Sequence, residues 1–173
     1  VFGVNPAQVL EGLGPPVSIS DNLPPTFAGF VEAGHFLPVD EYFQQDGFDV
    51  PDTVQRVSGY PKVRQYAYLV RGNSMDAVGI LDGMWVVAAS FMDFTETFGD
   101  PENGSLVIVQ RTRYQGAERE LTVKEIRYYR EHYELHPRST DPSYKPIIVP
   151  HDHKANGDAL EVQIVGVVLA ATR

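Results

Sequence analysis

Short apolar runs separated by turn-forming residues make up most of the chain after residue 28. The runs are rich in β-branched and aromatic residues, and at four to nine residues they are too short for typical helices. Such runs, bounded by Gly, Asn, Asp and Pro, are typical of strands. The pattern therefore predicts a mostly β fold with strands at 67–70, 84–89, 105–110, 121–129 and 162–170.

The segments between these runs have the composition of tight turns. We expect turns at 81–83, 100–104, 114–116 and 156–158. The first part of the chain differs, because prolines and glycines interrupt it and neither a helical nor a strand period is sustained. We expect residues 1–27 to form a linker or an N-terminal arm and residues 28–173 to form one domain. Since the chain opens on a valine, we also expect it to be a piece of a longer protein.

The composition excludes several classes of function. Acidic residues outnumber basic ones by 23 to 14, the net charge is −9, and no cluster of Lys and Arg stands out. Such a surface repels phosphate groups, so we do not expect this chain to bind nucleic acid by itself. The absence of cysteine excludes disulfides and thiolate chemistry and favours a reducing, cytoplasmic location. No apolar run approaches the roughly 20 residues of a membrane-spanning helix.

One serine occupies an unusual setting. The stretch YLVRGNSMDAVGILDGMWVVA, residues 68–88, places Ser74 in a glycine-containing turn between two apolar runs. A serine hydroxyl needs a nearby base to act as a nucleophile, and the backbone N–H groups of a tight turn can stabilise an oxyanion. Ser after Gly-Asn is also common in ordinary turns. The local sequence leaves both interpretations open.

The histidines provide no clear base for this serine. None has an acidic partner that the sequence reveals, and surface positions are the simpler interpretation for His35, His132, His136, His151 and His153. His151 and His153 would point the same way on a strand, which raises a metal-binding hypothesis, but no further ligands follow at a suitable spacing. We therefore expect no metal and no cofactor.

Lys124 is the second candidate for chemistry. Strand alternation in LTVKEIRYY, residues 121–129, places Lys124 on the same face as Thr122, Ile126 and Tyr128. A lysine held against apolar neighbours loses solvation of its ammonium group and can become a neutral base near pH 7. A solvated lysine on an exposed strand face fits the same pattern equally well.

With Ser74 and Lys124 in one chain, the sequence resembles the catalytic domain of the LexA-like self-cleaving repressors, the S24 family of Ser-Lys peptidases that includes phage CI-type repressors and UmuD. The segments that match the family's pattern, in order over about 140 residues, are VRGNSM, ILDGMWVVA, LTVKEI, LHPRSTDPSYKPIIV and IVGVVLA. The resemblance implies a β-rich, signal-peptidase-like domain of twisted antiparallel sheets. It also implies Ser74 as nucleophile, Lys124 as general base and acid, and the backbone of Ser74 and Met75 as the oxyanion site.

The family cuts its own chain at an Ala-Gly or Cys-Gly bond upstream of the serine. The segment FVEAGHFLP, residues 30–38, resembles that site and implies cleavage between Ala33 and Gly34. A second pair, Ala28-Gly29, is less favoured, because Val31 and Ala33 give the apolar-x-small pattern that such clefts accept.

Two features depart from the family's pattern. Ser74 and Lys124 are 50 positions apart (124 − 74), which indicates an insertion at 90–104 or at 111–120. The family's Pro-Gly-Asp before its central strand is replaced by Asn103-Gly104-Ser105. Neither change touches Ser74 or Lys124.

The resemblance also implies a biological role and partners. The role is that of an SOS-type transcriptional repressor, chromosomal or from a prophage, that cleaves itself after DNA damage. The partners are a second copy in a homodimer, the RecA filament on single-stranded DNA as co-protease, and operator DNA held by an upstream helix-turn-helix domain outside this chain, with no membrane partner. Two alternatives stay open: a UmuD-like subunit of an error-prone polymerase, and a catalytically silent oligomerisation or sensor domain of the same fold.

Overall fold

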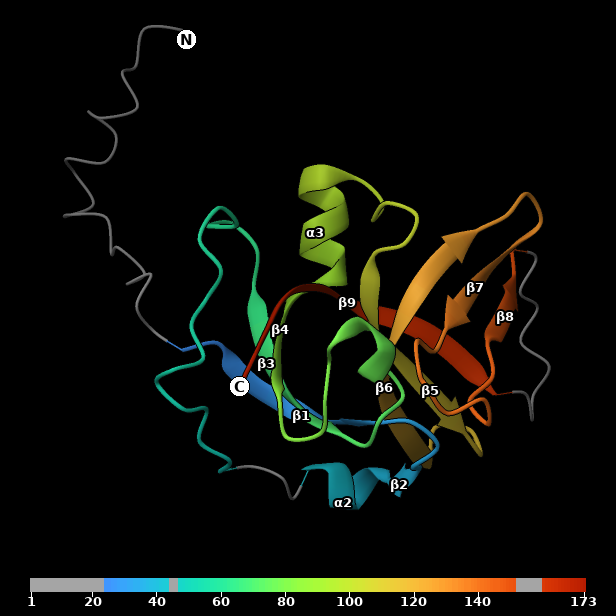
Figure 1. The fold of residues 1–173 in the computed structure, drawn as a ribbon, viewed down its shortest axis with the longest axis horizontal. Helices are drawn as coiled ribbons and strands as arrows, with labels where there is room; N and C mark the ends of the chain where they lie inside the picture. Colours follow the sequence, from blue (N-terminus) through green and yellow to red (C-terminus); the bar gives the residue numbers. More distant parts are fainter. Residues whose placement is uncertain (1–23, 44–46, 152–159) are drawn as a thin grey trace, which may run out of the picture.

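The computed structural model describes residues 24–43, 47–151 and 160–173 of the chain. These residues form one mixed sheet of nine strands, with two short α-helices and one 3₁₀ helix (Figure 1). In chain order the elements are β1 (Thr26–Glu32), β2 (Leu37–Pro38), α2 (Val39–Phe43), β3 (Gln65–Arg71), η1 (Asp76–Val78), β4 (Trp85–Ser90), α3 (Phe91–Phe98), β5 (Leu106–Arg113), β6 (Glu118–Tyr128), β7 (His132–His136), β8 (Ile147–Pro150) and β9 (Glu161–Thr172).

The strands follow the order β1-β3-β4-β9-β5-β6-β7-β8, and β2 pairs with β6. The predicted mostly β fold is confirmed, and each of the five predicted strands corresponds to one of β3, β4, β5, β6 and β9. The expectation of antiparallel sheets needs one correction, because β1 pairs with β3 in parallel. Strands β1, β2, β7 and β8 were not predicted.

The last strand, β9, joins the two halves of the sheet. Its end pairs with β4 and its beginning with β5, and a register shift interrupts each pairing. At Gly166, where β9 pairs with both neighbours, an added Cβ would lie 3.2 Å from the Ala89 carbonyl oxygen and 3.2 Å from Ile108 Cγ1. A glycine at this crossing therefore lets the two halves approach closely.

The hydrophobic core lies on both faces of β6. Leu121 and Val123 pack with Val31 of β1 and Met75 of the turn after β3. Ile126 packs in a second cluster with residues of β5, β7 and β8. This division follows the strand alternation read from the sequence. Strand β6 therefore contacts both β1 and the turn that carries Ser74.

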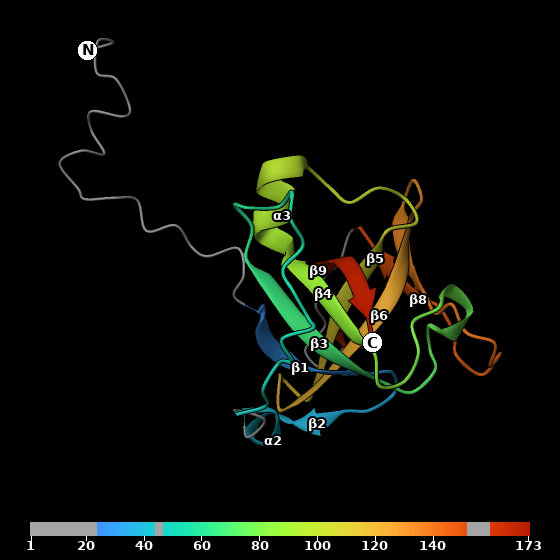
Figure 2. The same cartoon turned by 60° about the vertical axis from the view of Figure 1, so that its left-hand side comes forward.

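The region of the expected insertion at 90–104 contains α3. The helix begins after Ser90, whose hydroxyl accepts a hydrogen bond from the Asp93 amide at 3.5 Å, and Asp93 pairs with Arg64 at 2.8 Å. Figures 1 and 2 show α3 at one end of the molecule and α2 with β2 at the opposite end. Segment 90–104 is therefore folded against β4 and β9, on the side away from α2 (Figures 1 and 2), and whether it is an insertion stays a prediction.

The predicted boundaries are only partly covered by the described residues. Strand β1 begins at Thr26, within the last two residues of the predicted arm, while residues 1–23 and the predicted turn at 156–158 lie outside the described ranges. Within those ranges no helix has the length and apolar character that crossing a membrane requires.

Candidate functional site

Ser74 lies in the turn between β3 and η1. The turn begins where β3 ends at Arg71, and the Gly72 amide donates to Asp82 Oδ1 at 2.8 Å, which ties it to the turn before β4. Ser74 is 9% exposed. Within the described part of the chain, neither its hydroxyl nor the backbone N–H groups of Ser74 and Met75 make a hydrogen bond. The turn therefore presents a nearly buried hydroxyl together with two available amide donors.

A segment after β7, residues 138–144, holds this turn in place by hydrogen bonds, and we call it the clamp. The Arg138 amide donates to the Ser74 carbonyl oxygen at 3.0 Å, and the Tyr144 hydroxyl donates to Asn73 Oδ1 at 3.1 Å. Thr140 donates twice to the Asp76 carboxylate, from its amide at 2.7 Å and from its hydroxyl at 2.6 Å. These two bonds lower the pKa of Asp76 below its usual value. The sequence pattern matched this segment to the family but did not reveal that it holds the nucleophile turn.

Lys124 is buried in the middle of β6 and is only 3% exposed. Its Nζ donates to Thr122 Oγ1 at 2.7 Å and to the Val123 carbonyl oxygen at 3.1 Å. Burial disfavours the ammonium form and lowers the pKa of Lys124 to about 8, although Glu120 acts in the opposite direction and Arg111 in the same one. Of the two interpretations that the sequence left open, the desolvated lysine is the one found.

The nucleophile turn and the lysine strand meet in the same part of the molecule. Met75, next to Ser74, packs in the same core cluster as Val123, next to Lys124. Arg138, which bonds the Ser74 carbonyl, lies 3.6 Å from the carboxylate of Glu125, the residue after Lys124. The hydrogen bonds of Lys124 Nζ go to its own strand rather than to Ser74. Among the described residues, Ser74 and Lys124 therefore share no hydrogen bond.

The Ala33-Gly34 turn lies between two anchored segments. Before it, β1 runs parallel to β3 up to the pair Glu32 and Arg71. After it, β2 pairs with the start of β6. Gly34 is exposed and has a positive φ of 83°. The turn is thus held between the strand that leads to Ser74 and the strand that carries Lys124.

The alternative pair has a different environment. Ala28 and Gly29 lie inside β1, which pairs with β3 on both sides of a register shift at this point. Gly29 is buried, unlike Gly34. Ala28-Gly29 therefore lies within a paired strand, whereas Ala33-Gly34 lies in the turn between two strands, and the choice between the two bonds stays a prediction.

A buried ion pair contacts the turn. Glu120 of β6 is fully buried, and its carboxylate binds Arg111 of β5 and accepts a hydrogen bond from the Gly34 amide. The register of the hairpin explains the pair, because Arg111 lies directly opposite Glu120. Sequence reasoning did not identify either residue.

The histidines form a different arrangement from the one expected. An acidic partner exists on β7, where the Glu134 carboxylate bonds His132 Nε2 at 3.0 Å and His136 Nε2 at 2.6 Å. These bonds lower the pKa of Glu134. His35 is exposed, and His151 Nε2 lies 3.2 Å from the Tyr129 carbonyl oxygen. The i, i+2, i+4 spacing of His132, Glu134 and His136 on one strand face was the signal for the acidic partner.

Metal binding receives no support from the described residues. They hold no group of three or more His, Cys, Asp or Glu arranged to bind a metal ion. His153, the second histidine of the metal hypothesis, lies outside the described ranges.

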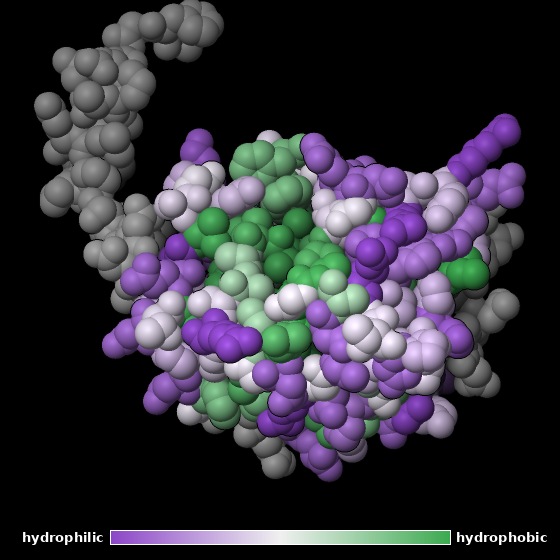
Figure 3. All heavy atoms as spheres, in the orientation of Figure 1, coloured by the Kyte–Doolittle hydropathy of each residue, from purple (hydrophilic) through white to green (hydrophobic). Residues whose placement is uncertain are grey.

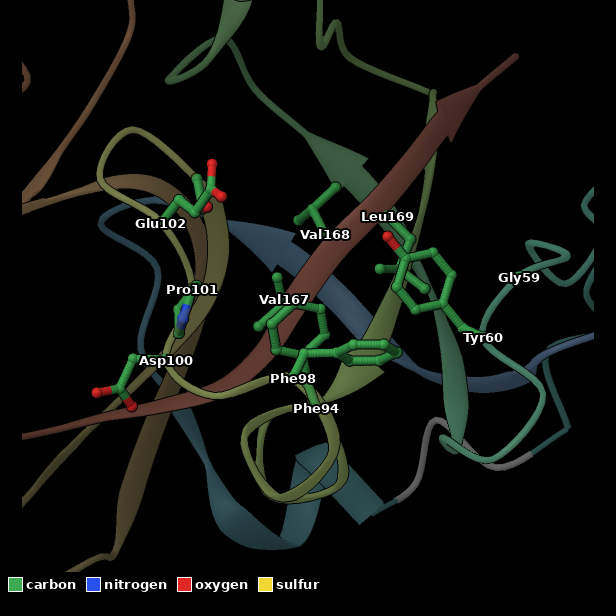
Figure 4. Close-up of a pocket in the computed structure, with 11 residues that line it drawn as sticks. Gly59, Tyr60, Phe94, Phe98, Asp100, Pro101, Glu102, Val167, Val168 and Leu169 are labelled. Carbon is green, nitrogen blue, oxygen red and sulfur yellow. The ribbon is translucent and has the colours of Figure 1, made fainter.

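The molecule also has a hollow beside α3, with a volume of about 580 Å³ and a lining of apolar and polar residues. Figure 3 shows apolar side chains gathered around this helix. In Figure 4 the rings of Tyr60, Phe94 and Phe98 lie together near β9. The lining contains neither Ser74 nor Lys124, so the hollow is separate from the candidate active site.

Comparison with known proteins places these features in one family. The model of the family described as Peptidase S24-like matches residues 25–169, which cover β1 to most of β9. Comparison with curated protein sequences gave no significant match. The matched range includes the Ser74 turn, the Lys124 strand, the segment that clamps the turn and both Ala-Gly pairs. The chain therefore belongs to the Peptidase S24-like family, whose members are serine peptidases of the self-cleaving LexA and UmuD kind.

Proposed function

We propose that this chain is the self-cleaving C-terminal domain of a LexA- or phage-type repressor, and that it cuts its own Ala33-Gly34 bond. Ser74 is the nucleophile and Lys124 is the general base. The observation that carries the proposal is the burial of Lys124, since it brings the pKa of the lysine to about 8 in a chain of this family. A lysine that is largely neutral just above pH 8 can remove a proton from a serine hydroxyl.

The chemistry passes one proton through the Lys124 amine during acylation and a second one during hydrolysis of the ester. Ser74 Oγ attacks the Ala33 carbonyl carbon while its proton moves to Lys124 Nζ. The lysine then gives that proton to the Gly34 nitrogen, the C–N bond breaks, and Ala33 remains esterified to Ser74. A water molecule, deprotonated by Lys124, hydrolyses this ester and restores the hydroxyl of Ser74. The free amides of Ser74 and Met75 are the donors available for the oxyanion.

The reaction is intramolecular, so docking of the turn supplies much of the rate. Two movements complete the site: Lys124 Nζ comes within hydrogen-bonding distance of Ser74 Oγ, and the Ala33 carbonyl reaches Ser74. An activator that favours this arrangement accelerates cleavage by shifting a population of conformers.

In this proposal the domain forms a homodimer, the RecA filament on single-stranded DNA is the activator, and operator DNA is bound by an upstream domain. Cleavage at Ala33-Gly34 then separates the DNA-binding part from the dimerising part in response to DNA damage. A UmuD-like polymerase subunit is the second candidate, because the same site would serve it. The gene sequence upstream of Val1 distinguishes the two, since a helix-turn-helix there identifies a repressor.

Self-cleavage should accelerate with alkaline pH. Because the pKa of Lys124 is lowered to about 8, the neutral base is scarce at pH 6 and predominant above pH 9. The rate is expected to rise through this interval and then level off. Intact-mass spectrometry of the purified chain during incubation at pH 6 to 10 should show two fragments that meet at Ala33-Gly34.

The matched control is Ser74→Ala, which removes only the hydroxyl oxygen of a nearly buried side chain. It should stay uncut at every pH. A wild-type chain that remains intact at pH 10, and also with RecA filaments, would instead support the silent oligomerisation or sensor domain.

Loosening the clamp on the nucleophile turn should slow cleavage without changing its pH dependence. Asp76→Ala removes both hydrogen bonds from Thr140, so Ser74 is held less firmly. We expect a rate roughly ten-fold lower, because small displacements of a nucleophile are costly. The pH midpoint should stay the same, since Lys124 is untouched. An unchanged rate at pH 9 would show that the clamp does not position Ser74.

A further inference from the structure

The carboxylate of Glu120 occupies a place that the proposed reaction has not yet used. It is fully buried and accepts a hydrogen bond from the amide of Gly34, the nitrogen that leaves when the Ala33-Gly34 bond breaks. Its second contact is the guanidinium of Arg111, which donates from Nε and from Nη2, the latter at 2.8 Å. A buried charge that binds one specific backbone amide fixes both the position and the orientation of that amide.

Glu120 is also close to the base. Glu120, Thr122 and Lys124 are alternate residues of β6, so their side chains share one face of the strand. The bond from Lys124 Nζ to Thr122 turns the amine back along the strand toward Glu120. The Glu120 carboxylate therefore contacts the Gly34 nitrogen, which is the leaving group, and lies on the same face of β6 as Lys124, which carries the proton.

We propose that Glu120 is a positioning residue for self-cleavage, which orients the Gly34 nitrogen and, together with Arg111, controls the proton on Lys124. The inference rests on the proposed function. While Glu120 holds the N–H of Gly34, the lone pair that develops on this nitrogen as the carbonyl carbon becomes tetrahedral points away from the carboxylate. Lys124 can then deliver its proton to the Gly34 nitrogen, because the direction of the lone pair on that nitrogen is already fixed.

The electrostatic part of the proposal follows from the charges around Lys124. Glu120 on β6 favours the ammonium form and Arg111 on β5 opposes it. Glu125, the next residue, binds Arg127 and Arg138 on the other face of β6. The cleavage turn also carries the exposed His35, and Asp76 follows the nucleophile turn, but neither acts on the pKa of Lys124. The charges of Arg111 and Glu120 are thus the ones to remove in order to test the effect on the pKa of Lys124.

The two partners should shift the pH profile of cleavage in opposite directions. Glu120→Gln keeps the shape and an oxygen acceptor for Gly34 but removes the negative charge, so the pH midpoint should fall by about one pH unit. At pH 7 that change makes cleavage roughly five-fold faster, because more of the lysine is neutral. Arg111→Gln removes the positive charge and should raise the midpoint.

The neighbouring pair provides a matched control. Glu118 lies two residues before Glu120 on β6 and binds Arg113 of β5, but its side chain is 28% exposed and does not act on Lys124. Glu118→Gln should therefore leave the midpoint unchanged. The control tests whether loss of a carboxylate charge in this hairpin shifts the midpoint when that carboxylate does not act on Lys124.

A second measurement covers the case in which a variant of the buried pair does not fold. In Ser74→Ala protein, which is expected to stay uncut, hydrogen exchange of the Gly34 amide should be slowed by its bond to Glu120. Fast exchange at Gly34 would overturn the positioning role. Midpoints that do not move in folded Glu120→Gln and Arg111→Gln would overturn the electrostatic role, while a wild-type chain that cuts itself would still uphold the proposed function.

Discussion

Replacing Lys124 with Met should abolish self-cleavage and, at the same time, make the folded domain more stable at neutral pH. Met has a similar length and no charge, so it can occupy the buried site in β6 without an ammonium group to desolvate. The base is lost and cleavage stops. The gain in stability distinguishes this variant from an ordinary core mutation, which lowers the free energy of unfolding.

The sign of the stability effect follows from the pKa of the lysine in the unfolded and folded chain. An unperturbed lysine side chain has a pKa of 10.5, whereas Lys124 in the folded chain has a pKa of about 8. Between these values the unfolded chain binds more protons, so stability rises with pH from about 8 to about 10.5. Below pH 8 the folded chain bears the full cost of a buried ammonium, about 3 kcal/mol at 1.36 kcal/mol for each pH unit.

The measurement compares Ser74→Ala with Ser74→Ala/Lys124→Met, so that neither protein cuts itself. Urea unfolding at pH 7 should give a larger free energy of unfolding for the double variant, and the difference should shrink toward pH 10.5. A double variant that is less stable at pH 7 would show that the packing of the lysine stem, or its bond to Thr122, outweighs the cost of the charge.

The elements predicted from sequence are those in which local pattern and burial agree. Strands β3, β4, β5, β6 and β9 consist of β-branched and aromatic runs, so composition was sufficient to find them. Strand β1, TFAGFVE, contains an Ala-Gly pair and directly follows the prolines of the arm, which concealed it. Strand β7, HYELH, alternates polar side chains that pair with each other rather than with solvent.

The relations between distant segments were harder to predict. The parallel pairing of β1 with β3 depends on how residues 33–64 return the chain, and no local pattern encodes that path. The pairing of Arg111 with Glu120 was missed by one residue. Counting outward from the predicted turn at 114–116 places Arg111 opposite Arg119, whereas in the structure Arg113 pairs with Glu118, so the turn spans 114–117 and Arg111 lies opposite Glu120.

The catalytic candidates show the same difference between local patterns, which the sequence reveals, and contacts between distant segments, which it does not. Ser74 and Lys124 were identified by motif, and alternation allowed for the burial of Lys124 that the structure shows. The contacts that support them come from other parts of the chain: Thr140 on Asp76, and Glu120 on Gly34. Such contacts depend on three-dimensional proximity of residues 64 and 86 positions apart, so one sequence does not reveal them.

The second large effect is expected at the cleavage turn, where Gly34→Val should strongly slow self-cleavage while leaving the fold intact. Gly34 has a φ of 83°, in the left-handed region that β-branched residues avoid. Valine there costs roughly 1–3 kcal/mol, which corresponds to a rate about ten- to hundred-fold lower if the reaction uses this backbone. Crowding is not the cause, because nothing lies within 4 Å of an added Cβ.

Gly99 offers a closely matched control for this prediction. It has a φ of 81°, also has nothing within 4 Å of an added Cβ, and lies at the end of α3 rather than at the turn. The ψ of Gly99 is −171°, a combination that only glycine adopts readily, so Gly99→Val should cause a backbone strain at least as large but leave the cleavage rate near that of the wild type. Fragment masses identify the bond in each case. If Gly34→Val cuts at the wild-type rate, or if the fragments meet at Ala28-Gly29, then the observed turn is not the one that reaches Ser74, and the bond inside β1 becomes the substrate.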